Sequence, residues 1–166
     1  AVPSNNESVY ITALILALIL DPVAVTDIRG IAAVAFTSVW AISSKFILAI
    51  RRKHLFNPAA LGVALSALLL DQPATWWVGG NLALLPLVLL GGMLIVRKLR
   101  RLDLVSTFVV VALATILATT DPSQYWTALA ETLGSSPLLF FAFVMLTEQL
   151  TAPTMRWPRI AFAAIV

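Results

Sequence analysis

The amino-acid sequence predicts an all-α membrane protein with about six helical segments, several of them half-length or broken. Two observations predict this fold class. Hydrophobic residues make up 60% of the 166 residues and charged residues only 11%, whereas about 25% of the residues in an average soluble domain are charged. Apolar runs also alternate with short loops that hold most of the lysines and arginines, as membrane topology requires. We expect residues 1–166 to form one transmembrane domain.

The composition also excludes several classes of function. The absence of cysteine excludes disulfides, thiolate metal sites, a cysteine nucleophile and direct ligation of an iron–sulfur cluster by this chain. The single histidine, His54, disfavours a haem held by two histidines. The net charge of +3 does not indicate nucleic acid as a partner, because the basic residues lie in short clusters between apolar runs. The sequence shows no catalytic acid–base pair, triad or metal site.

The first two apolar runs predict two helices. Ser8 is the candidate N-cap of a short helix over residues 9–20, which the pair Asp21-Pro22 ends. Asp27 is the candidate N-cap of a second helix, over residues 28–50, which is long enough to cross a bilayer with tilt. This second helix contains Lys45, and a cation inside a span is costly unless it snorkels, pairs or faces a polar cavity.

The next stretch, residues 51–70, changes from a basic loop to an apolar helix without a spacer. Asn57 is a good N-cap and Pro58 suits the first helical position. The apolar run has about 13 residues, or roughly 20 Å of helix, against the ~30 Å of a bilayer core. We therefore expect a half-helix whose unpaired N–H groups attract an anion such as phosphate. Four basic residues precede it: Arg51, Arg52, Lys53 and His54.

The second half of the chain predicts further helices over residues 81–96 and 102–119. Residues 123–132 are more polar and predict a short helix along the membrane surface. Ser136 and Pro137 begin another apolar helix, which reaches residue 146. A loop then leads to the apolar segment 160–166, which is too short to span. Because the chain begins without methionine and stops within this segment, we interpret it as a piece of a longer polypeptide.

The distribution of basic residues predicts a cytoplasmic N-terminus. With that orientation, nine of the eleven lysines and arginines fall on the cytoplasmic side. Arg29 falls on the other side, and Lys45 lies within a helix. The nine are Arg51, Arg52, Lys53, Arg97, Lys98, Arg100, Arg101, Arg156 and Arg159.

Four segments resemble one known family: KHLFNPAALG at residues 53–62, ATWW at 74–77, RKLRR at 97–101 and FVMLTEQLTAPTMR at 143–156. The chain resembles a pair of homologous membrane subunits from two respiratory complexes, the sodium-pumping NADH:quinone oxidoreductase and the Rnf ferredoxin:NAD oxidoreductase. The resemblance spans about two thirds of the chain. In the last segment, Glu148 and Gln149 replace the family's Asp-Pro. Full-length members have more helices, which implies a compact or partial form here.

The resemblance implies a module of a bacterial inner membrane that transfers electrons through an FMN-type flavin. The family attaches FMN to the threonine of a Ser-Gly-Ala-Thr motif, which this sequence lacks, so the flavin is expected to bind non-covalently. Electrons would come from a cytoplasmic NAD(P)H- or ferredoxin-linked reductase domain or subunit. The candidate flavin-binding residues are Lys45, Lys53, Asn57, Thr147, Thr151 and Thr154.

Each of these features also has a purely structural interpretation. Asn57 and Pro58 start a helix in any context, Lys45 can snorkel toward the basic loop, and Thr151 and Thr154 suit a cap and turn. Trp76, Trp77 and Trp126 suit interfacial anchors. Asn-Pro-Ala also occurs in the half-helices of aquaporins. Two alternative functions therefore stand beside electron transfer: a channel or carrier for a small polar solute, and a membrane anchor without a cofactor. The sequence does not predict the oligomeric state.

Overall fold

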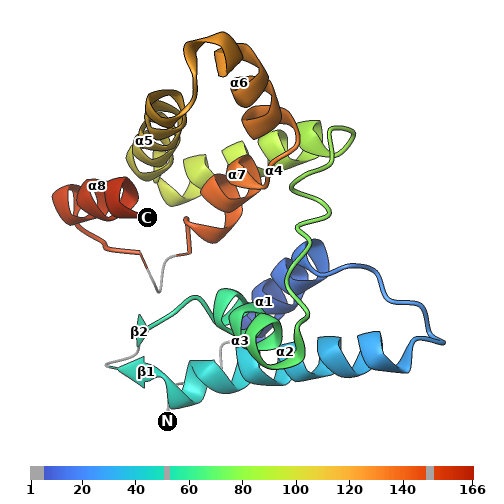
Figure 1. The fold of residues 1–166 in the computed structure, drawn as a ribbon. Coiled ribbons are helices and arrows are strands. Elements are labelled where there is room, and N and C mark those ends of the chain that lie inside the picture. The colour runs from blue at the N-terminus through green and yellow to red at the C-terminus, as the bar shows by residue number, and fades with distance from the viewer. Residues whose placement is uncertain (1–5, 51–52, 149–151) are drawn as a thin grey trace. The chain divides into compact units, whose positions relative to one another are not determined.

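The computed structural model describes residues 6–50, 53–148 and 152–166. The fold class is all-α, as predicted (Figure 1). In these ranges, α2 (Ile28–Ile47) and α5 (Leu102–Thr119) are long and apolar enough to cross a membrane. The bent pair Pro122–Gly134 and Leu138–Met145 makes a third candidate if it is one broken span. The chain divides into two compact units, residues 1–77 (unit 1) and 78–166 (unit 2). That they form one domain stays a prediction.

The described residues of unit 1 form three helices and a small hairpin. The helices are α1 (Asn6–Ile19), α2 and α3 (Pro58–Leu70), and the hairpin pairs β1 (Ala49–Ile50) with β2 (Lys53–His54). Helices α2 and α3 approach closely at Gly62, where an added Cβ would lie 2.6 Å from the carbonyl oxygen of Thr37. Glycine is therefore required at this crossing.

The starts of α1 and α3 lie at the same end of unit 1 as the end of α2. Lys45 in the last turn of α2 bonds to Ser8 in the first turns of α1, and the hairpin leads directly from α2 into α3. We call this the basic end of unit 1, and its described residues include Lys45, Lys53 and His54. The opposite end carries Asp21, Asp27 and Asp71, which flank the other helix termini.

At the opposite end, the loop after α3 completes the end of α1. The carbonyl oxygen of Ile19 accepts hydrogen bonds from the N–H groups of Thr75 (3.2 Å) and Trp76 (3.0 Å). The indole N–H of Trp77 donates to the carbonyl of Ala17 at 3.1 Å. Carbonyls that a short helix leaves unpaired are thus satisfied within unit 1. Trp77 therefore has a structural role that its interpretation as an interfacial anchor did not include.

The predicted N-caps of α2 and α3 are confirmed, whereas the predicted start of the first helix was wrong. The Asp27 carboxylate accepts from Gly30 N and the Asn57 side chain from Ala60 N, each at 3.0 Å. Helix α1 begins at Asn6, so Ser8 lies inside it and is not its cap. Helix α2 ends at Ile47, three residues before the predicted residue 50, because the chain turns there into the hairpin.

Unit 2 contains the remaining helices. They are α4 (Leu85–Leu99), α5, the 3-10 turn η1 (Pro122–Gln124), α6 (Tyr125–Gly134), α7 (Leu138–Phe140), the π-helix η2 (Phe141–Met145) and α8 (Arg156–Ile165). The π-helix packs closely on α4, because an added Cβ at Gly92 would lie 2.5 Å from the Cβ of Phe143. Among the described residues of unit 2, two apolar clusters contribute to the core, one around Val96 and Phe143 and the other around Leu104 and Ala163.

The prediction of 102–119 for α5 is confirmed residue for residue, but the bounds of its neighbours differ. Helix α4 starts at Leu85, four residues after the predicted start at residue 81. The reason is a turn before the helix, in which the Asn81 side chain accepts a hydrogen bond from Ala83 N at 2.9 Å. The apolar helix expected from Pro137 begins at Leu138 and becomes a π-helix. Helix α8 starts at Arg156, four residues before the predicted apolar segment. The polar surface helix corresponds to η1 and α6.

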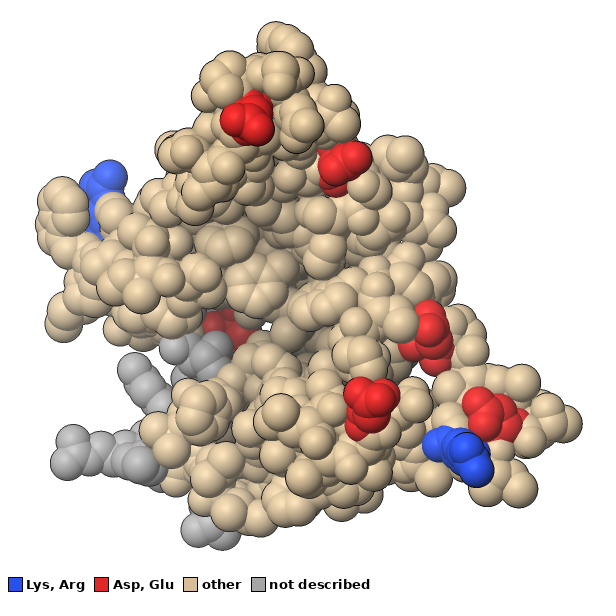
Figure 2. Space-filling model, viewed as in Figure 1, with Lys and Arg blue, Asp and Glu red and all other residues tan. Residues whose placement is uncertain are grey.

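The outer surface suits a lipid environment. Only 22% of the candidate span in α2 and 17% of that in α5 is buried inside the protein, so most of these side chains stay at least partly exposed. Figure 2 shows one face of the molecule, on which acidic and basic side chains are few and scattered. In water such exposure is unfavourable, whereas within a bilayer it is expected.

Candidate functional site

Lys45 is buried at the basic end of unit 1, with 5% of its surface exposed. Its amine donates to the Ser8 hydroxyl at 2.9 Å and also to the Ser8 carbonyl oxygen. A buried cation needs such partners, because leaving water is otherwise very unfavourable. The structure therefore places this residue inside unit 1, against the first turns of α1.

His54, in β2, lies close enough to Lys45 for the charge of Lys45 to act on its imidazole. It pairs with Ala49 across the hairpin, and Leu55 N donates to the Leu48 carbonyl at 3.1 Å. Burial lowers the pKa of the imidazole, and the positive charge of Lys45 lowers it further. Its Nδ1 atom is buried and has no hydrogen-bond partner among the described residues. Most buried polar atoms in proteins are hydrogen bonded, so this nitrogen is an exception among the described residues.

Asn57 lies where the hairpin meets α3. Its side-chain oxygen accepts from Ala60 N, and its own carbonyl accepts from Leu61 N at 3.0 Å. Two apolar side chains, Leu55 and Phe56, lie just before it and are 53% and 57% exposed. The basic end of unit 1 therefore combines a capped helix start, a buried amine, an imidazole and an exposed apolar surface.

The structure brings three of the six predicted flavin-binding residues to this end: Lys45, Asn57 and, by its backbone in β2, Lys53. The other three belong to unit 2. The Thr147 hydroxyl is buried and donates to the carbonyls of Phe143 (2.9 Å) and Val144 (3.1 Å), so it binds its own helix. Thr154 is exposed before α8. Thr151 lies outside the described residues, as do Arg51 and Arg52.

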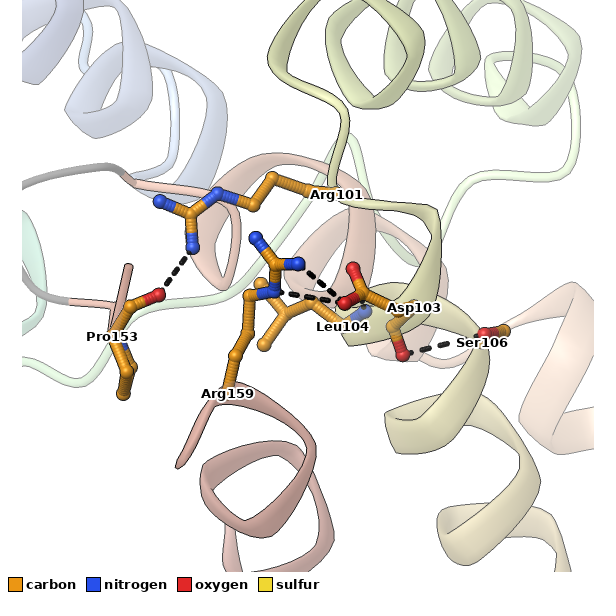
Figure 3. A network of polar contacts seen from close by, with 6 residues as sticks. All are labelled: Arg101, Asp103, Leu104, Ser106, Pro153 and Arg159. Atoms are coloured by element: carbon orange, nitrogen blue, oxygen red, sulfur yellow. Dashed lines mark hydrogen bonds and ion pairs between the residues drawn. The ribbon is translucent and has the colours of Figure 1, made fainter. Parts of the chain in front are cut away.

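Unit 2 contains a second polar site, shown in Figure 3, that links α5, α8 and the segment before α8. Arg159 donates to one carboxylate oxygen of Asp103, through Nε at 3.0 Å and through Nη2. Arg101, at the N-cap of α5, donates from Nη1 to the Pro153 carbonyl at 2.7 Å. We call Arg101, Asp103 and Arg159 the arginine network.

The arginine network carries an excess of positive charge. The network has two guanidinium groups and one carboxylate, which Arg159 binds, and Arg101 is only 6% exposed. Burial lowers the pKa of Arg101 and the charge of Arg159 lowers it further, while Asp103 raises it; an arginine nevertheless remains protonated. Sequence reasoning had interpreted both arginines only as determinants of topology. The signal that it missed was Asp103, a single acid directly after the basic run RKLRRL.

Two cavities accompany these sites. One, of about 80 Å³, lies at the end of unit 1 opposite the basic end. Its lining includes Asp21, Thr37, Ser66 and Thr75. This volume is much smaller than that of a typical small-molecule pocket, which is at least about 300 Å³. The other, of about 380 Å³, is a groove between α5 and α8. Neither of these two cavities lies at the basic end of unit 1.

Comparison of the chain with protein-family models, curated proteins and solved structures found no match. The family resemblance therefore rests on the four sequence segments alone. Within the described ranges, no group of three or more His, Asp or Glu side chains is placed to hold a metal ion.

Proposed function

We propose that the chain is a membrane electron-transfer module that binds an FMN-type flavin non-covalently at the basic end of unit 1. One observation carries the proposal: the Asn57-capped start of α3 shares that end with the buried Lys45 amine and with His54, whose buried Nδ1 lacks a partner among the described residues. A phosphate matches these groups, since the positive end of a helix and nearby cations both favour an anion.

Each residue then has a defined part in binding. The positive end of α3 and the imidazole of His54 attract the phosphate, while Lys45 supplies positive charge from inside unit 1. Leu55 and Phe56, both exposed, offer an apolar surface to the flavin ring. The flavin supplies the redox chemistry and the protein binds and orients it. A cytoplasmic NAD(P)H- or ferredoxin-linked reductase domain or subunit is the proposed electron donor, on the basis of the sequence resemblance.

The absorption spectrum of the detergent-purified chain, supplied with FMN, tests this function. We expect bands near 370 and 450 nm, and we expect acid precipitation to release the colour into the supernatant. Colour that stays in the precipitate would mean covalent attachment and contradict the proposed binding mode. A colourless protein would overturn the proposal, and solute flux into proteoliposomes would then separate a channel or carrier from a cofactor-free anchor.

A matched pair of substitutions tests the location. Asn57→Asp keeps the side-chain acceptor that caps α3 but places a negative charge where the phosphate is proposed to bind. We expect it to weaken FMN binding at least tenfold, which corresponds to ~1.4 kcal/mol. Asn81→Asp is the control, because Asn81 also accepts a hydrogen bond from a backbone N–H but lies in unit 2. Equal FMN affinity in both variants would exclude the basic end of unit 1 as the site.

A further inference from the structure

The groove between α5 and α8 in unit 2 is lined by apolar residues with one exception, Thr115. Phe108, Val111, Ala112 and Ile116 line it from α5, and residues 163–166 line it from α8. The one hydroxyl in the lining, that of Thr115, donates to the Val111 carbonyl at 2.9 Å and is therefore satisfied within its own helix. The groove offers no charged side chain, so its occupant must be apolar there.

The arginine network lies beside one end of this groove. Asp103 precedes Phe108 by five residues and Ile116 by thirteen, which at 1.5 Å per residue places the groove about 8–20 Å along α5 from the network. One leaflet of the hydrocarbon core is about 15 Å deep. The groove and the network therefore have the spacing of a lipid tail and its headgroup.

The network end is built to receive an anion. Two arginines and one carboxylate lie there: Arg159 binds Asp103, whereas Arg101 donates to a backbone carbonyl and is more than nine-tenths buried. Helix α8 begins beside them at Arg156, and its N-cap residue Met155 makes no side-chain capping hydrogen bond, so the first N–H groups of α8 are available to a ligand. The Arg156 side chain is exposed as well. All of these features favour negative charge at this position.

The neighbouring surface has the character of a membrane interface. Trp157 and Met155 are 78% and 73% exposed at the start of α8, and tryptophan is enriched at the headgroup level. Three basic residues lie at the end of α4 just before the network: Arg97, Lys98 and Arg100. Basic clusters beside a spanning helix attract anionic lipids at about 1 kcal/mol per charge.

We propose that unit 2 binds an anionic phospholipid, with its phosphate at the arginine network and the start of α8 and one acyl chain in the groove between α5 and α8. This site is separate from the proposed flavin site in unit 1. A lipid satisfies both halves of the site, whereas a free anion would leave the groove unused and an apolar helix would leave the excess positive charge unpaired.

The affinities of the full chain for phosphatidylglycerol and phosphatidylcholine in mixed detergent micelles test the proposal, measured by native mass spectrometry. We expect phosphatidylglycerol to bind at least tenfold more tightly. Arg156→Gln should lower its affinity about fivefold, as expected for one interfacial charge, with Arg29→Gln in unit 1 as the control. Ala164→Trp, which fills the groove, should weaken both lipids, whereas Ala161→Trp on the same helix, outside the lining, should not.

Three results would overturn the proposal. Equal affinity for the two lipids would exclude headgroup recognition. Full competition by inorganic phosphate, with no effect of Ala164→Trp, would identify a free-anion site. A change in oligomeric state caused by Ala164→Trp at unchanged lipid affinity would assign the groove to a second copy of the chain. Flavin absorption by the same preparations reports on unit 1 separately, so the two proposals fail independently.

Discussion

The amine of Lys45 is hydrogen bonded to the hydroxyl of Ser8 at 2.9 Å, although 37 residues separate them in the chain. This contact ties the last turn of α2 to the first turns of α1. It also provides polar partners for a cation that is 5% exposed. Lys45 thus holds two helices together at the end of unit 1 where we propose flavin binding.

Replacing Lys45 with methionine should therefore destabilise unit 1. Lys45→Met keeps the length of the side chain but removes a charged hydrogen bond, which typically contributes about 1.5–3 kcal/mol. Thermal unfolding in one detergent measures the effect, with Lys98→Met, near the end of α4, as the control. If Lys45→Met matched or exceeded the wild type in stability, burial of the amine would outweigh its hydrogen bonds.

The cap of α3 gives a second prediction. Asn57→Ala removes the acceptor for Ala60 N and should lower stability by about 1 kcal/mol. Asn57→Asp retains the acceptor and adds negative charge at the positive end of the helix, so its stability should stay near that of the wild type. Unfolding of both variants without flavin tests this. An equal loss of stability in both would mean that the 3.0 Å bond contributes little.

The stability of the protein should depend on the protonation of His54, the single histidine in the chain. Its pKa is lowered in the folded state, so the unfolded chain binds the proton more strongly. Stability is therefore fully present above about pH 6.5 and declines as the pH falls below that value. We expect the melting temperature to drop less between about pH 7.5 and about pH 5.5 in His54→Gln than in the wild type. Identical pH dependence would contradict the prediction.

Substitution of two adjacent glycines in α4 by alanine should have different effects on stability. At Gly92 a new Cβ would lie 2.5 Å from the Cβ of Phe143, whereas at Gly91 no atom lies within 4 Å. Gly92→Ala should therefore lower stability by about 1–3 kcal/mol through overpacking. Gly91→Ala should be neutral, or stabilising by up to about 1 kcal/mol. Unfolding experiments on the two variants measure the difference in stability. Equal stability of the two variants would mean that the π-helix is not packed on α4.

The elements that the sequence predicted well are those whose boundaries are set locally. Asp27, Asn57 and the helix-stopping pair Asp121-Pro122 act on their own neighbours, and the helices that they delimit were predicted closely. The hairpin between α2 and α3 was not predicted, because strands of two residues have no periodic pattern. Hydropathy also missed the start of α8, since its first turn contains Arg156 and Arg159; Pro158 in that turn was a usable signal.

The sites depended on long-range contacts, which one sequence does not reveal. Lys45 was recognised as an unusual charge, but nothing near it in sequence pointed to Ser8. Asp103 and Arg159 are 56 residues apart, and each alone is an ordinary charge at the end of a helix. The sequence likewise does not show that Nδ1 of His54 is buried and has no hydrogen-bond partner among the described residues. Local chemistry thus located the helix start, and tertiary structure determined which charged groups meet.

The bond between Trp77 and Ala17 joins residues 60 positions apart, and this has a consequence for biogenesis. While the ribosome is still making α2 and α3, the last carbonyls of α1 have no partners from the chain itself. They must stay in contact with water, with the translocon or with headgroups until residues 75–77 emerge. Unit 1 can close only after residues 75–77 have left the ribosome, so its folding is expected to be completed late.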